Sequence, residues 1–250
     1  MVTFNVHYAD DLPALVRSIQ RNPALCAADV FLLQETESYK SEGASRTHKL
    51  ARALKLNYVY APARYIEEGG THGLAILSRY PLSDITVIPL KQFDLNLNTR
   101  RRIAVAATVT VGSRSLRFYN LHLDTRVNLE DRLEQLRPVV RAAVEQAIPH
   151  VILGGDFNTN PFRWLFHVIP VFYSDQADTV DEFMRKNGFA TPFAEAGPTN
   201  RRPMFRFRVD SIYSRGVTVE GFGIERSVEV SDHFPLWLDV GWSESDSAPR

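Results

Sequence analysis

Two segments of the sequence are apolar throughout, and this pattern restricts the folds open to the chain. They are DVFLLQ at 29–34 and HVILGG at 150–155. Strands that read as continuous apolar runs are covered on both faces by other layers, whereas strands with one solvated face alternate apolar and polar residues. The two segments therefore predict interior strands of a layered protein.

Other runs rich in β-branched and aromatic residues predict further strands, with helical patterns between some of them. In all, strands are predicted over 2–8, 29–35, 57–62, 73–79, 85–90, 102–111, 115–124, 150–158, 206–214, 217–225 and 234–240. Apolar residues at helical intervals predict helices over 11–20, 45–55, 128–147 and 177–188. This mixture predicts an α/β protein with a mixed sheet or two stacked sheets and helices outside.

The length of 250 residues fits one large domain or two small ones. No internal repeat or linker divides the chain, so we expect a single domain over 1–241 and a polar tail over 242–250. No segment approaches the roughly 18 apolar residues of a membrane span, and no signal peptide is recognisable. We therefore expect a cytoplasmic protein with no membrane span and no obligate protein partner.

Composition limits the chemistry of the chain. Cys26 is the only cysteine, which excludes a disulfide or a cysteine-based zinc site within one chain. Metal chemistry would have to use oxygen or histidine ligands. The formal net charge is zero, which argues against tight nonspecific nucleic-acid binding driven by overall charge but leaves a local basic patch open.

Polar side chains stand where the two apolar strands end. Glu35 ends the first strand, and Asp156 and Asn158 end the second. A carboxylate at the edge of a core is costly unless a cation meets it, and Mg²⁺ accepts one or two carboxylates together with waters and substrate phosphate. Two alternatives remain open: Glu35 could cap the next element or pair with an arginine, and GGDFNTNP at 154–161 could be an ordinary turn.

A histidine and a carboxylate form a second candidate group. His233 follows Asp232 directly before the last predicted strand. Asp210 is a candidate partner that would fix the tautomer of His233 and raise its pKa. The alternative for Asp210 is an ion pair with Arg206 or Arg208.

Two more strands carry polar residues on a shared face. His122 ends one of them, two positions after Asn120, although a lone histidine there is more often a core residue. In the first strand, Asn5 could donate its amide to a phosphate or to a carboxylate ligand. We interpret His7 as a packing residue.

Taken in chain order, these groups resemble the endonuclease/exonuclease/phosphatase superfamily. The matching residues are Asn5, QE at 34–35, HLD at 122–124, GDFN at 155–158, the aspartate of VDSIY at 209–213 and SDH at 231–233, together with GLAILSRYP at 73–81. The resemblance implies a four-layer α/β sandwich with two mixed β-sheets packed face to face and helices outside. It also implies a metal-dependent site at one edge of the sheets.

The resemblance implies a role for each carboxylate and amide. Asp156 would orient and deprotonate the attacking water, and Asn158 would hold that water or a phosphate oxygen. Glu35 would be the principal ligand of Mg²⁺, with Mn²⁺ or Ca²⁺ as alternatives. Asn5 and Asp232 would complete or support the metal site.

The resemblance also assigns the histidines. His233, oriented by Asp210, would contact the phosphate and exchange protons or stabilise the transition state. His122 would bind a non-bridging oxygen or assist the leaving group. No glutamate in 56–68 matches the partner that this second histidine has in the deoxyribonuclease pattern, which argues against two histidine dyads. Substrate binding is assigned to Asn5, Asn120, Arg101 and Arg102.

Three segments could select the substrate. Arginines cluster at 100–102 and again at 201–208, where they alternate with Phe205 and Phe207. Such a pattern can grip nucleic acid, but strand alternation also produces it, and we favour that simpler interpretation. The aromatic segment 160–175 could form a rim for a lipid or a nucleobase, although we favour core under a long loop.

These features together predict a Mg²⁺-dependent hydrolase of phosphodiester bonds in nucleic acid or nucleotides. The alternatives are a phosphomonoesterase, a phospholipid or sphingomyelin phosphodiesterase of the same superfamily, and a noncatalytic binding scaffold. The implied partner is a phosphate-ester substrate, such as DNA or RNA.

Overall fold

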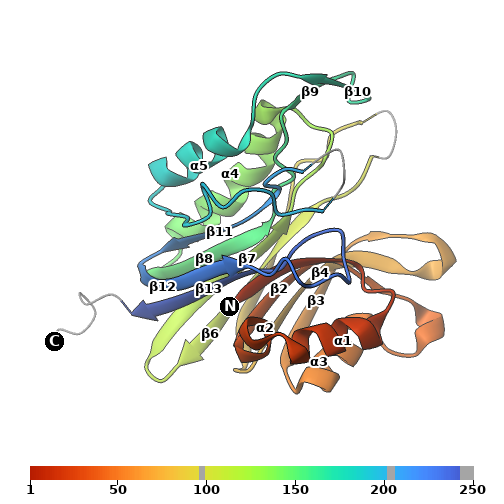
Figure 1. The fold of residues 1–250 in the computed structure, drawn as a ribbon, viewed down its shortest axis with the longest axis vertical. Coiled ribbons are helices and arrows are strands. Elements are labelled where there is room, and N and C mark those ends of the chain that lie inside the picture. The colour runs from red at the N-terminus through yellow and green to blue at the C-terminus, as the bar shows by residue number, and fades with distance from the viewer. Residues whose placement is uncertain (96–98, 202–205, 243–250) are drawn as a thin grey trace.

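The protein folds as two mixed β-sheets packed face to face, with helices on both outer faces (Figure 1). The computed structural model describes residues 1–95, 99–201 and 206–242. The predicted four-layer α/β sandwich is confirmed. None of the helices in these ranges has the length and apolar character that a membrane crossing needs.

The first sheet has six strands in the order β12-β13-β1-β2-β4-β3. β1 and β2 run parallel at its centre, and the other neighbours are antiparallel. The strands are β1 (Val2–Tyr8), β2 (Val30–Ser38), β3 (Asn57–Tyr65), β4 (Thr71–Ser78), β12 (Val217–Ile224) and β13 (Leu236–Trp242).

The second sheet has five strands in the order β11-β8-β7-β6-β5. Here β7 and β8 form the parallel pair. The strands are β5 (Leu82–Pro89), β6 (Ile103–Val111), β7 (Arg114–His122), β8 (His150–Asp156) and β11 (Asp210–Arg215). Together the two sheets contain all the predicted strands.

Helices cover the outer face of each sheet. On the first sheet lie α1 (Leu12–Arg21), α2 (Pro23–Ala27) and α3 (Arg46–Leu54); on the second lie α4 (Leu129–Glu145) and α5 (Ala177–Lys186). Two short 3-10 helices occupy Lys40–Glu42 and Glu67–Gly69. Each predicted helix is present.

The two apolar strands lie in the interior of the sandwich. In β2, Leu32 faces the other sheet while Leu33 faces the helices, and in β8 the same division separates Ile152 from Leu153. All four side chains are fully buried. The prediction that both strands are covered on two faces is confirmed.

One element departs from the expectation for the aromatic segment. β9 (Phe162–Leu165) and β10 (Ile169–Phe172) form a separate antiparallel hairpin, which projects at the end of the molecule near α4 (Figure 1). Every residue of β10 is exposed. The interpretation of this segment as buried core is therefore wrong.

The last strand extends one residue into the predicted tail. β13 ends at Trp242, whose ring stacks edge-on against His150. The remainder of that tail, 243–250, lies outside the described residues.

Candidate active site

Four strands from both sheets deliver polar side chains to one edge of the sandwich. β1 and β2 end there in the first sheet, and β7 and β8 end there in the second. Ligands in α/β sheets bind at the carboxyl ends of such strands. At this edge lie Asn5, Glu35, His122 and Asp156.

Irregular backbone aims the side chains of the first sheet into this edge. The pairing register shifts in β1 between Asn5 and Tyr8, and in β2 between Leu33 and Thr36. Bulges of this kind redirect side chains and are common beside active sites. Glu35 has a φ of 56°, a left-handed conformation that costs a non-glycine residue about 1–3 kcal/mol. The fold therefore spends stability to place this carboxylate.

The paired glycines of β8 let two backbones approach closely. Gly155 has a φ of 151°, and a Cβ there would lie 2.0 Å from the carbonyl oxygen of Leu121 in β7. The chain then turns sharply: the amide of Asn158 donates to Asp156 Oδ1 at 2.9 Å, and Asn158 Nδ2 donates to the carbonyl of Leu123 at 2.9 Å. These bonds fix the Asp156 carboxylate toward the cleft.

Asp156 Oδ2 lies at the centre of the site. Asn5 Nδ2 donates to it at 3.0 Å, His122 Nε2 lies 3.4 Å away and His233 Nε2 lies 3.9 Å away. Burial raises the pKa of Asp156 to about 7, and the negative charge of Asp210 adds to this effect. A carboxyl that titrates near neutral pH is well suited to general base catalysis.

His233 and Asp210 form a hydrogen-bonded pair. His233 Nδ1 lies 2.9 Å from Asp210 Oδ2, and the hydroxyl of Thr199 donates to that same oxygen at 2.7 Å. Arg208, one of the alternative partners considered for Asp210, pairs instead with Asp181. Burial opposes protonation of His233, but the charge of Asp210 and its hydrogen bond outweigh it and raise the pKa of His233 to about 10. His233 is thus a cation at neutral pH.

His122 is fully enclosed and differs from His233 in its charge. Burial lowers the pKa of His122 well below its ordinary value, and the positive charge of Arg102 adds to this effect. Its Nε2 lies 3.9 Å from Glu35 Oε1. Within the part of the chain that the structure describes, its Nδ1 has no hydrogen-bond partner. The neutral imidazole and its Nδ1 without a partner agree with the missing glutamate counterpart in the sequence.

Carboxylate oxygens that could bind a divalent cation line the first-sheet side of the cleft, at Glu35 and Asp232. His7 Nδ1 lies 3.3 Å from Asp232 Oδ1 and 4.0 Å from Glu35 Oε2, so its ring stands between two carboxylates. Asn5 Oδ1 accepts a hydrogen bond from the amide of His7. This set of hard oxygens fits Mg²⁺. The interpretation of His7 as a packing residue is wrong, because its side chain is 45% exposed.

A second cluster also has metal-like spacing. Ligand atoms of Asp156, Asp210 and His233 all lie within 4.8 Å of one another. The Nδ1 of His233 and the Oδ2 of Asp210 are already bonded to each other, and Thr199 occupies the same carboxylate oxygen. We therefore interpret this cluster as proton-transfer groups and place the candidate metal site at Glu35 and Asp232.

Of the residues assigned to substrate binding, some lie at the cleft and one is buried away from it. Asn120 is completely buried between the sheets, where its Nδ2 donates to the carbonyls of Leu33 and Ala75. This position gives no support to contact with substrate. Arg102 lines the cleft with its Nε held 2.9 Å from Asp124 Oδ1, and exposed Arg101 borders a small adjoining hollow.

The cleft has two adjoining compartments with different character. They have volumes of about 330 and 310 Å³ and share Glu35, His233, Thr125 and Trp164. The first is lined by arginines and the second by apolar rings: Arg100, Arg102 and Arg126 against Phe162, Trp164, Pro170 and Phe207. The first compartment also contains Glu35, Asp124 and Asp232, so a substrate centred at Glu35 and His233 would meet a wall of mixed charge on one side and an apolar wall on the other.

The second arginine cluster is largely engaged within the protein. Arg201 contacts Glu229 and the carbonyl of Val228, and Arg208 pairs with Asp181. Arg206 is exposed. Arg202 and Phe205 lie outside the described residues. These pairings weaken the case for an arginine-rich nucleic-acid grip in this segment.

Several residues of the site have no signal in the sequence. Thr199 anchors Asp210 by accepting hydrogen bonds from the amides of Val209 and Asp210, while Thr125 and Arg126 line the cleft. Thr199 lies outside the predicted strands, whereas Thr125 and Arg126 directly follow the strand predicted over 115–124. Alternation from Asn5 places His7 on the same face, which was the one available indication of its position.

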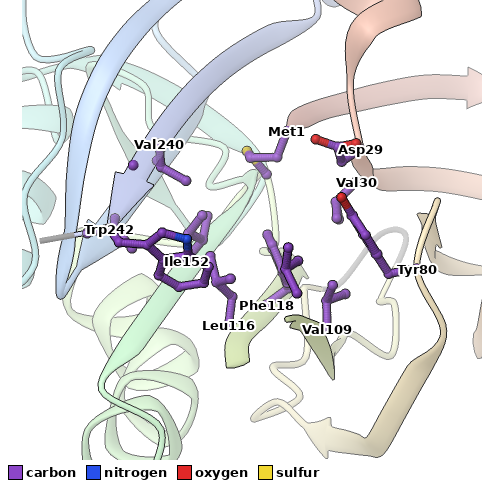
Figure 2. Close-up of a pocket in the computed structure, with 13 residues that line it drawn as sticks. Met1, Asp29, Val30, Tyr80, Val109, Leu116, Phe118, Ile152, Val240 and Trp242 are labelled. Atoms are coloured by element: carbon purple, nitrogen blue, oxygen red, sulfur yellow. The ribbon is translucent and has the colours of Figure 1, made fainter. Parts of the chain in front are cut away.

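A separate cavity of about 180 Å³ lies at the opposite end of the sheets (Figure 2). It is lined by Met1, which precedes β1, by Val30 of β2 and Ile152 of β8, and by Phe118 and Trp242. Asp29 is the one carboxylate among its lining residues, and none of them is a histidine. The groups capable of acid–base chemistry are therefore concentrated at the other edge.

Comparison with known proteins identifies the family and the fold. Residues 2–233 match the model of the Endonuclease/Exonuclease/phosphatase family. The fold is similar to that of an endonuclease/exonuclease/phosphatase from Beutenbergia cavernae DSM 12333, with a TM-score of 0.74 and 21% identity over 96% of this chain and 70% of that chain. No curated protein matches the sequence significantly.

Two further solved structures share the fold. Humanized TDP2 from D. rerio has a TM-score of 0.68 and 19% identity, covering 96% of this chain and 97% of that chain. A mannosyl-6-phosphatase from Bacteroides thetaiotaomicron VPI-5482 has a TM-score of 0.66 and 17% identity, covering 96% and 98%. At these identities the comparisons establish the fold and leave the substrate open.

Proposed function

Since the chain belongs to the endonuclease/exonuclease/phosphatase family of phosphoester hydrolases, we propose that it hydrolyses phosphodiester bonds with the help of Mg²⁺. One observation carries this proposal. A carboxyl that titrates near neutral pH, a cationic histidine and a candidate metal ligand meet at one cleft: Asp156, His233 and Glu35.

Asp156 is the proposed general base. Its Oδ2 is held by Asn5 and faces the apolar compartment of the cleft, where a water attacking phosphorus would stand. Transfer of a proton from that water to Asp156 makes the water a stronger nucleophile. Positioned proton transfer of this kind contributes about 10² to 10⁴ in rate.

His233 is the proposed stabiliser of charge that develops on phosphorus-bound oxygens. Asp210 and Thr199 fix its ring, so its Nε2–H can donate to a phosphoryl oxygen without reorganisation. Fixed donors in a water-poor site are the largest contribution in many hydrolases. Asn158 and neutral His122 line the same compartment and are assigned to phosphate or leaving-group contacts.

Glu35, Asp232 and Asn5 are the residues that would hold Mg²⁺, with Mn²⁺ or Ca²⁺ as alternatives. When bound, the cation supplies Lewis-acid stabilisation of negative charge on the phosphate. The support for this assignment is the oxygen donor set: Glu35 and Asp232 line the same compartment, and each has a carboxylate oxygen within 4.0 Å of His7 Nδ1.

Two substrate classes fit the divided cleft. A nucleotide or nucleic acid is the class expected from the sequence, and the rings of Trp164 and Phe207 could stack a base. A phospholipid is the second candidate, favoured by the apolar compartment and by the exposed hairpin that supplies part of its wall.

A substrate panel tests the reaction class. Bis-p-nitrophenyl phosphate, p-nitrophenyl phosphate, an oligonucleotide, an inositol phosphate and sphingomyelin are assayed in EDTA and again after Mg²⁺, Mn²⁺ or Ca²⁺ is restored. We expect metal-dependent cleavage of diesters over monoesters. Asp156→Ala and His233→Ala should each remove most turnover while the fold remains intact. Full activity in both variants would show a noncatalytic role for this cleft.

A further inference from the structure

The β9–β10 hairpin concentrates exposed apolar side chains in one place. Seven of the 14 exposed large hydrophobic residues within the described ranges lie between Leu165 and Tyr173. Phe166 is 79% exposed and Phe172 is 76% exposed. Soluble proteins expose single apolar residues widely, but a contiguous patch of this kind marks an interaction surface.

The tip of the hairpin is conformationally strained as well as exposed. Phe166 and His167 have φ values of 52° and 56°, in the left-handed region that bulky residues seldom adopt. Phe166 is exposed, whereas His167 is half-buried. The amide of Val168 donates to the carbonyl of Leu165, so the two residues form the turn of the hairpin and present the ring of Phe166 at its tip.

Hydrogen bonds hold the hairpin outward beside the cleft. The amide of Trp164 donates to Asn128 Oδ1 at 2.8 Å, and Asn128 Nδ2 donates back to the carbonyl of Trp164 at 3.3 Å. His167 Nδ1 lies 2.9 Å from the carbonyl oxygen of Arg126. These contacts fix the orientation of the hairpin relative to the cleft wall.

The two faces of the hairpin have different environments. Cross-strand register pairs Trp164 with Pro170, and both line the apolar compartment of the cleft. The opposite face pairs Leu165 with Ile169, and both are exposed. Apolar side chains therefore lie on the face of the hairpin that lines the cleft and on its opposite face. The hairpin itself projects at the end of the molecule (Figure 1).

The charge around the hairpin is complementary to an anionic surface. Residues 162–174 contain no aspartate or glutamate, whereas they include Arg163 and His167. The neighbouring compartment of the cleft contains Arg100 and Arg126 together with Asp124 and Asp232, so the positive charge that belongs to the hairpin itself is that of Arg163. Aromatic rings with nearby basic residues are typical of protein segments that lie in the headgroup region of a bilayer.

We propose that the hairpin 162–173 contacts an anionic phospholipid bilayer and seats the catalytic cleft on it. The substrate class is then a lipid phosphodiester at that surface, with its phosphate at Glu35 and His233 and its apolar part along the wall formed by Trp164 and Pro170. The substrate assignment rests on the proposed hydrolase function, but binding of the bilayer does not.

Vesicle sedimentation of the full chain tests the binding. The vesicles contain phosphatidylcholine alone or phosphatidylcholine with phosphatidylglycerol. We expect binding to the anionic vesicles and a loss of affinity of roughly tenfold or more for the double variant Phe166→Ser/Ile169→Ser. The control Ile85→Ser/Val87→Ser changes another exposed apolar pair, on β5, and should bind as the unmodified chain does.

Activity on a soluble diester separates the two proposals. Phe166→Ser/Ile169→Ser should hydrolyse bis-p-nitrophenyl phosphate as the unmodified chain does and should lose turnover of phospholipid in vesicles. Vesicle binding without diester hydrolysis refutes the hydrolase function and leaves the membrane contact standing. Diester hydrolysis without vesicle binding refutes the membrane contact and leaves the hydrolase function standing.

Three results would overturn the membrane contact. One is failure of the unmodified chain to bind either vesicle, and another is equal binding by Phe166→Ser/Ile169→Ser. The third is an unmodified chain that does not bind vesicles but self-associates or binds an oligonucleotide, when the double variant has lost that interaction. Retained hydrolysis of the soluble diester shows that the double variant is folded.

Discussion

Asn5 Nδ2 donates a hydrogen bond of 3.0 Å to Asp156 Oδ2, although the two residues are 151 positions apart in the chain. Asn5 belongs to β1 of the first sheet and Asp156 to β8 of the second. The bond therefore joins the two sheets at the edge where the cleft opens. It connects the side of the cleft that carries the candidate metal ligands with the side that carries the proposed general base.

Replacing Asn5 with leucine should raise the pKa of Asp156 further. The hydrogen bond from Asn5 is one of the contributions that lower this pKa, against the raising effect of burial. If Asp156 must be ionised for turnover, kcat/KM should fall more at about pH 6 than at about pH 8.5. The control Asn57→Ala removes amide hydrogen bonds at the far end of the same sheet. If the fall of kcat/KM at low pH occurred at the same pH in the variant as in the unmodified chain, the role of Asp156 would be contradicted.

Addition of Mg²⁺ to the metal-free protein should release a proton at about pH 6 and almost none at about pH 9. Because burial raises the pKa of Asp156 to about 7, its carboxyl is largely protonated under the more acidic condition, and a nearby cation favours the ionised form. Calorimetry in two buffers with different ionisation enthalpies counts the proton.

Glu35→Gln provides the matched test of the metal ligand. It should weaken Mg²⁺ binding by roughly tenfold or more, since an amide replaces an anionic oxygen. Glu182→Gln, on the exposed surface of α5, should bind as the unmodified chain does. For the unmodified chain, a heat of Mg²⁺ binding at about pH 6 that is the same in both buffers would exclude proton release.

Asp210→Asn should lower the pKa of His233 from about 10 toward its ordinary value of 6.5. Burial lowers the pKa of His233, and the negative charge of Asp210 is the largest effect that raises it. The substitution removes that charge. His233 would then lose its proton near neutral pH, and kcat should fall by about 10² to 10⁴. NMR titration of the histidine ring reports the pKa directly. The control Asp178→Asn, at an exposed position of α5, should leave it unchanged.

The same substitution has a predictable effect on stability. A histidine whose pKa is raised by folding stabilises the folded state fully below its unfolded pKa, and this contribution disappears as pH rises through the folded value. Asp210→Asn should therefore lower the free energy of unfolding at about pH 6, with a smaller loss above about pH 10. Denaturation at the two pH values measures the difference, and an equal loss at both would contradict the charge on His233.

Asn120→Ala should destabilise the protein without weakening substrate binding. The side chain bonds two carbonyls of the opposite sheet and accepts from Gln34, so its removal leaves several buried polar groups without partners. We expect the free energy of unfolding to fall by roughly 2–4 kcal/mol and KM to stay within about twofold. A raised KM at unchanged stability would restore the substrate-binding role predicted from the sequence.

Strand and helix positions follow from the sequence because each depends on local periodicity. Continuous apolar character identified β2 and β8, and the polar residues that end them mark the edge of the sheets. The order of Asn5, Glu35, Asp156 and His233 along the chain was enough to indicate the family. These features are visible because parallel strands bring their carboxyl ends to the same side.

Other features depend on contacts that no local pattern encodes. Apolar residues are usually buried, so the aromatic segment 160–175 reads as core, whereas the structure presents it as an exposed hairpin. Alternation placed Asn120 on the same face as His122 but gave no measure of its depth between the sheets. The left-handed backbone at His7 and the distant partners of Arg208 likewise arise from tertiary structure.

The division of the site between two sheets also bears on how the protein folds. An intermediate with both sheets formed but not yet packed together would carry every required side chain and still be inert, since Asn5 and Asp156 would be far apart. Recovery of turnover during refolding therefore reports the docking of the halves, while the far-UV signal reports the earlier formation of strands and helices.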